Sequence, residues 1–181
     1  MISGKEIIRQ VENGNITIEP FDSKQAGPNS YDLRLSNLLA EVIANSTERF
    51  GTGMIDTHEP SRIKYQKMLD SGAFVLIPGK MYLGSTMESM GSKHFVPVLH
   101  GRSSAARHGL MVHLCAGFAD VGWYGQWVLE IVNLTPYPML VWPGDRVCQV
   151  SFERLEGEAE LYQSTYQNQT GIVPGKGLGD E

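Results

Sequence analysis

The sequence predicts a mainly β domain, a barrel or sandwich of short strands with a few short helices. Two observations carry this prediction. Short apolar runs follow one another through the second half of the chain, and turn-forming pairs such as Pro78-Gly79 and Pro143-Gly144 separate them. The 181 residues suffice for one domain with a sizeable core. We find no internal repeat of fixed period, so we expect a single domain over residues 1–181.

The chain opens with a predicted helix. Residues 3–6, Ser-Gly-Lys-Glu, have the form of a capping box at a helix start. Apolar side chains behind the box share one helical face, and Asn13-Gly14 ends the helix. Residues 16–18 then predict a brief strand that Pro20 stops.

Residues 31–35 alternate apolar and polar side chains, which is typical of a strand. Asp32 and Arg34 then share one face of it. The apolar run at residues 38–43 extends the strand.

Residues 45–72 are the hardest to interpret. Residues 62–70 favour a helix capped by Ser61. A surface excursion or a lid is the alternative for this stretch.

Apolar runs bounded by glycine and proline predict the remaining strands. They cover residues 74–77, 81–83, 95–99, 127–132, 139–142 and 147–150. Gly84 is expected to end the second of these. From about residue 162 the chain is polar and rich in glycine, which predicts a flexible tail.

Charge and hydropathy narrow the kinds of partner. The formal net charge of −5 argues against a broad nucleic-acid surface or an anionic membrane, although a few local Arg and Lys side chains can still hold one phosphate group. No apolar run approaches the length of a membrane span, and the N-terminus lacks the apolar core of a signal peptide. We therefore expect a cytoplasmic protein with no nucleic-acid or membrane partner.

The cysteines and histidines argue against a protein-bound zinc ion. Zinc-dependent nucleobase deaminases need a Cys-x-x-Cys pair, and the two cysteines here, Cys115 and Cys148, are far apart in the sequence. The histidines show no HExxH or comparable spacing. Both cysteines lie in apolar runs, so we expect buried free thiols.

One carboxylate interrupts an apolar strand. Within residues 127–132, alternation places Glu130 on the same face as Val128 and Val132. An ionised carboxylate among apolar side chains is costly unless it is paired or its pKa shifts, and such groups often mark functional sites. The alternative is an outward-facing glutamate on an edge strand.

A cluster of hydroxyl and guanidinium groups precedes this strand. Residues 102–107 read Arg-Ser-Ser-Ala-Ala-Arg, and Gly109 follows them. Ser103 or Ser104 can cap a short helical turn, which would present backbone N–H groups and two guanidiniums to an anion. An ordinary surface helix cap is the alternative.

Weaker candidates surround these two. Asp120 lies in a turn before a glycine, where aspartates are usually structural. His113, Trp123 and Trp127 are expected to be core residues, with the histidine hydrogen-bonded. Lys176 and the tail glycines could wrap a phosphate chain in a nest of backbone N–H groups, whereas most such tails are disordered.

Together these segments resemble the dCTP deaminase branch of the dUTPase-like trimeric nucleotide hydrolases. The central segment of that family has the form RSSxxRxGLxVH, then A, then D-x-G-W-x-G, then VLE and N. Order and spacing are kept here at residues 102–107, 109–113, Ala116, residues 120–125, residues 128–130 and Asn133. Weaker resemblance covers most of the chain.

The resemblance implies a distorted β-barrel or jelly-roll of the dUTPase-like (β-clip) type, in a homotrimer with active sites between subunits. The implied reaction is zinc-independent hydrolysis of dCTP to dUTP and ammonia, with Mg²⁺ bound through the triphosphate. dUTP and the inhibitor dTTP are further candidate ligands. Nucleotide contacts are expected at Arg102, Ser103, Ser104, Ala105, Ala106, Arg107, Ala116, Asp120, Val128, Leu129, Glu130, Tyr162 and Gln169.

The resemblance also implies roles for the catalytic groups. Glu130 would take a proton from the attacking water and pass it on. Arg107 would orient Glu130, and Ser103 would hold the water or the developing oxygen. Asp120 would accept the sugar 3′-hydroxyl.

Two departures from the family pattern affect the phosphate and base contacts. Thr165 stands where the family usually has a phosphate-binding lysine before the tyrosine of the tail. Lys176 is the candidate replacement. Gly117-Phe118 stands where a basic or polar pair is common after the alanine.

Other functions are weighed against deamination alone. A bifunctional enzyme would release dUMP and pyrophosphate, with Asp120 activating water against the α-phosphate as in a dUTPase. A dUTPase alone and a non-catalytic nucleotide-binding regulator are further alternatives. A β-sandwich interaction protein would not explain Glu130 together with residues 102–104.

Overall fold

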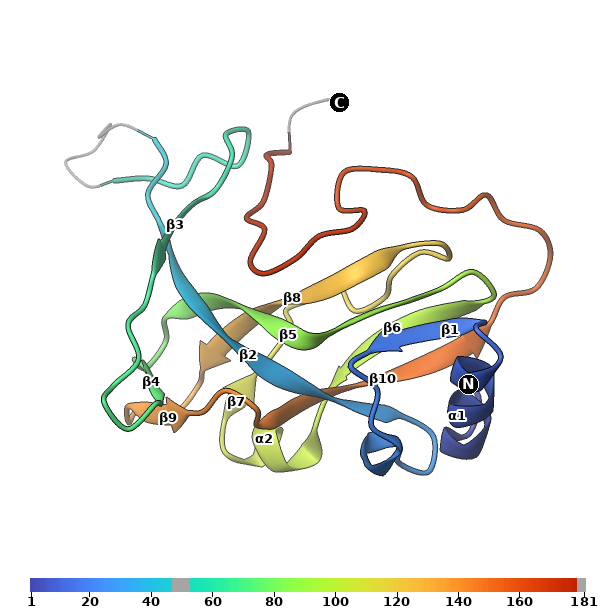
Figure 1. The fold of residues 1–181 in the computed structure, drawn as a ribbon. Coiled ribbons are helices and arrows are strands. Elements are labelled where there is room, and N and C mark those ends of the chain that lie inside the picture. Colours follow the sequence, from blue (N-terminus) through green and yellow to red (C-terminus); the bar gives the residue numbers. More distant parts are fainter. Residues whose placement is uncertain (47–52, 179–181) are drawn as a thin grey trace.

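The computed structural model describes residues 1–46 and 53–178. Residues 47–52, which belong to the stretch 45–72 that is hardest to interpret from sequence, lie outside the described residues. The fold is mainly β, as predicted, and the main sheet curls into a nearly closed, barrel-like layer (Figure 1). The helices are α1 (Gly4–Glu12), the 3₁₀ turn η1 (Ser23–Gln25) and α2 (Ser103–Arg107). The strands are β1 (Ile16–Glu19), β2 (Tyr31–Ile43), β3 (Arg62–Tyr65), β4 (Phe74–Leu76), β5 (Met81–Ser92), β6 (Phe95–Gly101), β7 (Leu110–Met111), β8 (Tyr124–Asn133), β9 (Met139–Val141) and β10 (Arg146–Arg154).

The main sheet is antiparallel. Its hydrogen-bonded order is β6-β10-β2-β5-β8-β7, with β1 paired to β5 and β3 paired to the outer end of β2. β5 is the centre of the sheet because it pairs with β1, β2 and β8 along its length. A separate pair, β4 and β9, lies at one end of the molecule (Figure 1).

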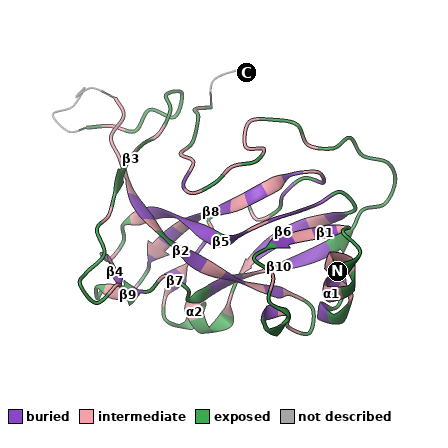
Figure 2. Ribbon diagram, in the orientation of Figure 1, coloured by how far each residue is buried: buried purple, intermediate pink, exposed green. Residues whose placement is uncertain are grey.

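Alternation along β2 builds one side of the core, as the sequence predicts. Tyr31, Leu33 and Leu35 are fully buried. Asp32 and Arg34 between them are half-buried on the other face. Figure 2 shows buried residues concentrated along the strands and exposed residues on the helices and loops.

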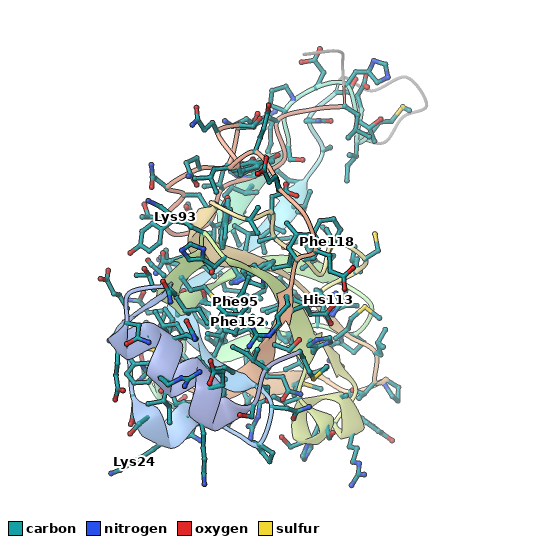
Figure 3. The ribbon with its side chains drawn as sticks, turned by 90° about the vertical axis from the view of Figure 1, so that its right-hand side faces the viewer. Lys24, Lys93, Phe95, His113, Phe118 and Phe152 are labelled. Atoms are coloured by element: carbon teal, nitrogen blue, oxygen red, sulfur yellow. The ribbon has the colours of Figure 1, made fainter. Side chains whose placement is uncertain are left out.

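Aromatic side chains fill the centre of the core. Phe95 on β6 and Phe152 on β10 belong to the main apolar cluster (Figure 3). Trp123 and Trp127 are buried, and their ring centroids are 5.1 Å apart. The prediction that both tryptophans pack in the core is confirmed.

Helix α1 begins as predicted. The Ser3 hydroxyl accepts a hydrogen bond from the backbone N–H of Glu6 at 3.3 Å. The Glu6 carboxylate accepts bonds from Arg9 and Gln10, and the bond from Arg9 is the main reason why the pKa of Glu6 is lowered. Ile7 is fully buried and anchors the helix to the core.

The helix predicted at residues 62–70 is wrong. Arg62–Tyr65 forms β3, whose residues pair with the outer end of β2. Ile63 packs against a small apolar cluster that contains Ala40 and Ile172. Burial of one face of an alternating segment on a strand outweighs weak helical signals.

Gly84 does not end a strand, contrary to the prediction, because β5 runs through it. A Cβ atom at this position would come 2.8 Å from the Ile131 side chain and 3.2 Å from Leu35. The glycine therefore serves close packing between strands rather than a turn.

One of the two cysteine predictions is wrong. Both cysteines are free, and Cys148 is buried, which raises the pKa of its thiol. Cys115 is exposed because it lies in an irregular loop after β7 rather than in a strand. Across the described part of the chain, no helix is both long enough and apolar enough to cross a membrane.

Candidate functional site

Strand β8 carries the leading candidate. Its residues alternate between half-buried and buried, so Val128, Glu130 and Val132 share the open face while Leu129 is in the core. The predicted alternation is confirmed, but the carboxylate is half-buried rather than fully buried. Its Oε2 accepts a hydrogen bond from the backbone N–H of Leu114 at 3.2 Å.

Glu130 lines a cavity of about 580 Å³. Six of the predicted nucleotide contacts line this cavity together: Ala116, Asp120, Val128, Glu130, Tyr162 and Gln169. Most of the other lining residues are apolar or aromatic, which suits a base and a sugar. Among the described residues of the lining, the charged side chains are both acidic, Asp120 and Glu130.

Two buried ring nitrogens lack a hydrogen-bond partner within residues 1–46 and 53–178. They are His113 Nδ1 and Trp127 Nε1. The expectation of a hydrogen-bonded core histidine is therefore not met at this nitrogen. Trp127 is among the residues that line the cavity, and its indole N–H is a donor without a partner among the described residues. In Figure 3, His113 and Phe118 lie on the same side of the core residues Phe95 and Phe152. Phe118 is exposed and lines the cavity.

The first half of the tail forms one wall of the cavity. The backbone N–H of Tyr162 donates to the carbonyl of Val121 at 2.8 Å, and that of Gln126 donates to the carbonyl of Gln169 at 3.0 Å. The tail thus runs beside the turn before β8 and beside the start of β8 (Figure 1). The contacts describe a docked tail, and its flexibility stays a prediction.

Glycines on the sheet side permit this docking. A Cβ atom at Gly122 would come 3.0 Å from the backbone nitrogen of Tyr162. At Gly125 it would come 2.8 Å from the carbonyl oxygen of Gln169. The glycine spacing of the D-x-G-W-x-G segment is therefore explained by the close approach of the tail backbone.

The second half of the tail pairs with residues 53–65, which we call the arm. The backbone N–H of Ser61 donates to the carbonyl of Gly175, and that of Leu178 to the carbonyl of Thr57, both at 2.7 Å. Together the arm and the tail contribute Ile55, Ser61, Val173 and Gly175 to the lining. Residues 53–65, part of the stretch that is hardest to interpret from sequence, therefore help to cover the cavity.

Helix α2 lies away from the cavity. Figures 1 and 3 differ by a turn about the vertical axis, and in both α2 is at the bottom and the tail near the top. None of the described residues 102–107 lines the cavity. One chain therefore does not bring Ser103 and Arg107 to Glu130.

Ser103 and Ser104 do not cap α2, contrary to the prediction, because they are its first helical residues. The N-cap is Arg102, whose side chain makes no cap bond. Its Nε lies 3.0 Å from Oδ1 of Asp32 on β2, and its Nη1 donates to the carbonyl of Arg146 at 3.0 Å. The guanidinium therefore reaches back to the sheet.

The sequence analysis missed a buried carboxylate, Glu88 on β5. It accepts hydrogen bonds from Arg34 Nε at 2.7 Å, from the backbone N–H of Arg34 at 2.9 Å and from Gln25 Nε2 at 3.1 Å. A fully paired buried carboxylate of this kind stabilises the junction of β2 and β5. The sequence does not predict it, because Gly84 signals a strand end whereas β5 continues through this glycine to Ser92.

No group of three or more His, Cys, Asp or Glu side chains in the described part of the chain is arranged to hold a metal ion. The cavity offers the carboxylates of Asp120 and Glu130. A magnesium ion that arrives with a triphosphate would have most of its oxygen ligands from the phosphates and water.

A family profile described as dCTP deaminase-like matches residues 1–155. A Clostridium beijerinckii protein named "dCTP deaminase, dUMP-forming" is 41% identical over 175 residues, 96% of this chain and 94% of its own length. Proteins of the same name from Hathewaya histolytica and Cytophaga hutchinsonii are 41% and 40% identical, each over 96% of this chain and over 95% and 94% of their own lengths.

One solved structure supports the fold alone. The 2′-deoxycytidine 5′-triphosphate deaminase from Agrobacterium tumefaciens matches with a TM-score of 0.62 and 24% sequence identity. The match covers 83% of this chain and 46% of that chain.

Proposed function

Because this chain belongs to the dCTP deaminase-like family, we propose that it deaminates dCTP and then hydrolyses the dUTP formed to dUMP and pyrophosphate. The family resemblance implies dUTP as the final product. The relatives named dUMP-forming favour the bifunctional alternative instead. The observation that carries the proposal is that Glu130 and Asp120, one carboxylate for each reaction, line the same cavity.

In the first step, water adds to C4 of cytosine. Glu130 moves one proton of the water to N3 and then moves the proton of the new hydroxyl to the amino group. The C4–N bond breaks, ammonia leaves, and C4 keeps the carbonyl oxygen of uracil. The Leu114 N–H binds one carboxylate oxygen of Glu130, which leaves the other oxygen for the water.

In the second step, Asp120 activates a water molecule against the α-phosphorus. A new P–O bond forms to the water oxygen, and the bond to the bridging oxygen of the β-phosphate breaks, so pyrophosphate leaves. Asp120 takes the proton of the water and releases it to solvent. The same carboxylate is the expected acceptor for the sugar 3′-hydroxyl.

The phosphates need cations that the cavity lining lacks. Arg102 and Arg107 are the expected ligands, but neither lines the cavity of their own chain. We infer a homotrimer in which α2 of one protomer meets the cavity of its neighbour. Arg107 then orients Glu130 across the interface, and Ser103 holds the attacking water.

Lys176 supplies a cation from the tail. Its Nζ donates to the carbonyl of Thr165 at 2.8 Å and lies 5.5 Å from the ring centroid of Tyr166, which lines the cavity. An ammonium has three donors, so two are left for phosphate oxygens. Lys176 thus lies beside the position where the family usually has its lysine. Mg²⁺ arrives bound to the triphosphate, whose oxygens are hard ligands of the kind it prefers.

Product analysis tests this function. Purified protein incubated with dCTP and Mg²⁺ should release ammonia, pyrophosphate and dUMP in equal amounts, and dUTP supplied alone should give dUMP. Ammonia with accumulating dUTP and no pyrophosphate would restrict the activity to deamination. Tight dCTP binding without any product over hours would instead support a regulator, and CTP serves as the control for the sugar.

A further inference from the structure

The start of α2 is held by two neighbouring side chains of the main sheet. Asp32 on β2 binds Arg102 with 3.0 Å between Oδ1 and Nε. Gln149 on β10 donates from Nε2 to the carbonyl of Gly101 at 3.1 Å. Asp32 and Gln149 face each other in the β2–β10 ladder. The sheet therefore fixes both the backbone and the side chain at the point where α2 begins.

Asp32 is itself held in place. Its backbone carbonyl accepts a hydrogen bond from Gln25 Nε2 at 2.7 Å, and the same nitrogen donates to the buried carboxylate of Glu88 at 3.1 Å. The Asp32 side chain is only 15% exposed and that of Arg102 is 31% exposed. A pair so far removed from water is less screened than a surface ion pair and keeps a defined geometry.

The remaining donors of Arg102 point to a role. A guanidinium has five N–H donors in a rigid fork. Nε is used by Asp32 and one Nη1 hydrogen by the carbonyl of Arg146, which leaves three N–H donors for an anion. Arg146 Nη1 also lies 3.5 Å from Asp32 Oδ2. Two guanidiniums and one carboxylate give this cluster an excess of positive charge.

The geometry points to Asp32 as a positioning residue for the triphosphate. It binds the inner edge of the Arg102 guanidinium and thereby orients the outer edge toward phosphate oxygens, so that little side-chain entropy is lost when the nucleotide binds. Asp32 does not touch the nucleotide. This inference rests on the proposed function, which assigns α2 to the phosphates.

Asp32→Asn is the direct test. It keeps the shape of the side chain and removes its charge, so the Arg102 fork loses its partner. We expect KM for dCTP to rise about tenfold, because one charge-assisted hydrogen bond is lost. The value of kcat should stay within about twofold of that of the unsubstituted protein. Asp32→Glu should restore part of the affinity. Asp145→Asn is the matched control, since it removes a carboxylate whose hydrogen bond is to the backbone N–H of Trp142.

Coupling to Arg102 separates positioning from a purely structural role. Lysine at position 102 presents a point charge without a fork to orient. Asp32→Asn should therefore raise KM far less in the Arg102→Lys background than in the unsubstituted protein. Equal fold-changes in both backgrounds, or an unchanged KM in Asp32→Asn alone, would overturn the inference while the two-step conversion of dCTP stands.

A phosphate probe tests the inference without the reaction. Inorganic tripolyphosphate should bind the Asp32→Asn protein about tenfold more weakly in calorimetry, with melting temperature and oligomeric state unchanged. Equal binding of tripolyphosphate by both proteins, or no binding by either, refutes the role of Asp32. Absence of any product from dCTP would refute the proposed function separately.

Discussion

Two glutamates on neighbouring strands show how partners decide the role of a carboxylate. Glu88 on β5 is fully buried and accepts three hydrogen bonds from Arg34 and Gln25. Glu130 on β8 is half-buried and accepts one bond from the backbone of Leu114. A carboxylate acts as a base only through lone pairs that are not already engaged. The free capacity of Glu130, more than its burial, therefore qualifies it for proton transfer.

Glu130→Gln tests this assignment. The amide keeps the size of the side chain but cannot take a proton from water, so the rate of ammonia release should fall by about 10²–10⁴-fold. Because no phosphate contact is altered, the dissociation constant for dCTP should change little. Release of pyrophosphate from dUTP, the step assigned to Asp120, should persist. Ammonia release near the unsubstituted rate would remove Glu130 from the mechanism.

For a single residue, the sequence predicts which face of a strand the side chain lies on better than it predicts how exposed that side chain is. Period-two alternation places Glu130 on one face of β8 without any tertiary information. The degree of burial depends on what covers that face, and the cover comes from the arm and the tail, which are distant in sequence. For the same reason the Arg102–Asp32 pair was not predicted, since β2 and the start of α2 meet only in the fold.

The position of the tail depends on two glycines, because a side chain at either position would collide with the tail backbone. Gly122 and Gly125 allow its backbone to lie directly on the turn and strand beneath it. Tyr162 and Gln169, both expected to contact the nucleotide, belong to the segment that docks there. The close approach that Gly122 and Gly125 allow therefore places Tyr162 and Gln169 at the cavity.

Gly125→Ala should displace the tail. The added methyl group would meet the carbonyl oxygen of Gln169 at 2.8 Å, and overpacking of this kind costs about 1–3 kcal/mol. We expect KM for dCTP to rise severalfold and chymotrypsin to cleave faster near Tyr162 and Tyr166. Gly27→Ala is the control, because its nearest contact would be an ordinary 3.4 Å. An intact tail with unchanged KM would show that the segment tolerates the methyl group.

Some helices and strands can be predicted from local sequence signals, whereas others depend on contacts with distant parts of the chain. The capping box of α1 and the alternation of β2 are local signals, and both were predicted correctly. The segment that forms β3 was read as a helix because its capping serine and length are local signals too. Its strand conformation depends on pairing with β2 and on Ile63 packing against Ala40 and Ile172. Neither the pairing nor the packing can be predicted from the local sequence pattern.

For the whole molecule, the proposed function needs two groups of residues that one chain keeps apart. The cavity with Glu130 and Asp120 is covered by the arm and the tail, whereas none of the described residues 102–107 lines it. Residue pattern alone does not predict this separation, because residues 102–107 and Glu130 belong to one continuous motif; the expectation of sites between subunits came from the family resemblance. In the homotrimer proposed above, each protomer would complete the cavity of its neighbour and so bring the two groups together.

Subunit mixing tests the shared site. Glu130→Gln and Arg107→Ala proteins should each be nearly inactive in ammonia release. After subunit exchange of equal amounts, about a quarter of the unsubstituted activity should return, because half of the cavities keep Glu130 and half of the facing helices keep Arg107. Mixing Glu130→Gln with the doubly substituted protein should restore nothing. If mass spectrometry shows mixed assemblies without recovered activity, each site is built within one chain.

The cavity is lined on one side by strand β8 and on the other by the arm and the tail, and this has a practical consequence. The acid on β8 is rigidly placed by the sheet, while the arm and the end of the tail contact each other through backbone groups at Thr57, Ser61, Gly175 and Leu178. Under the proposed function, substitutions confined to these two surface segments would change which pyrimidine nucleotides are accepted and leave Glu130 in place.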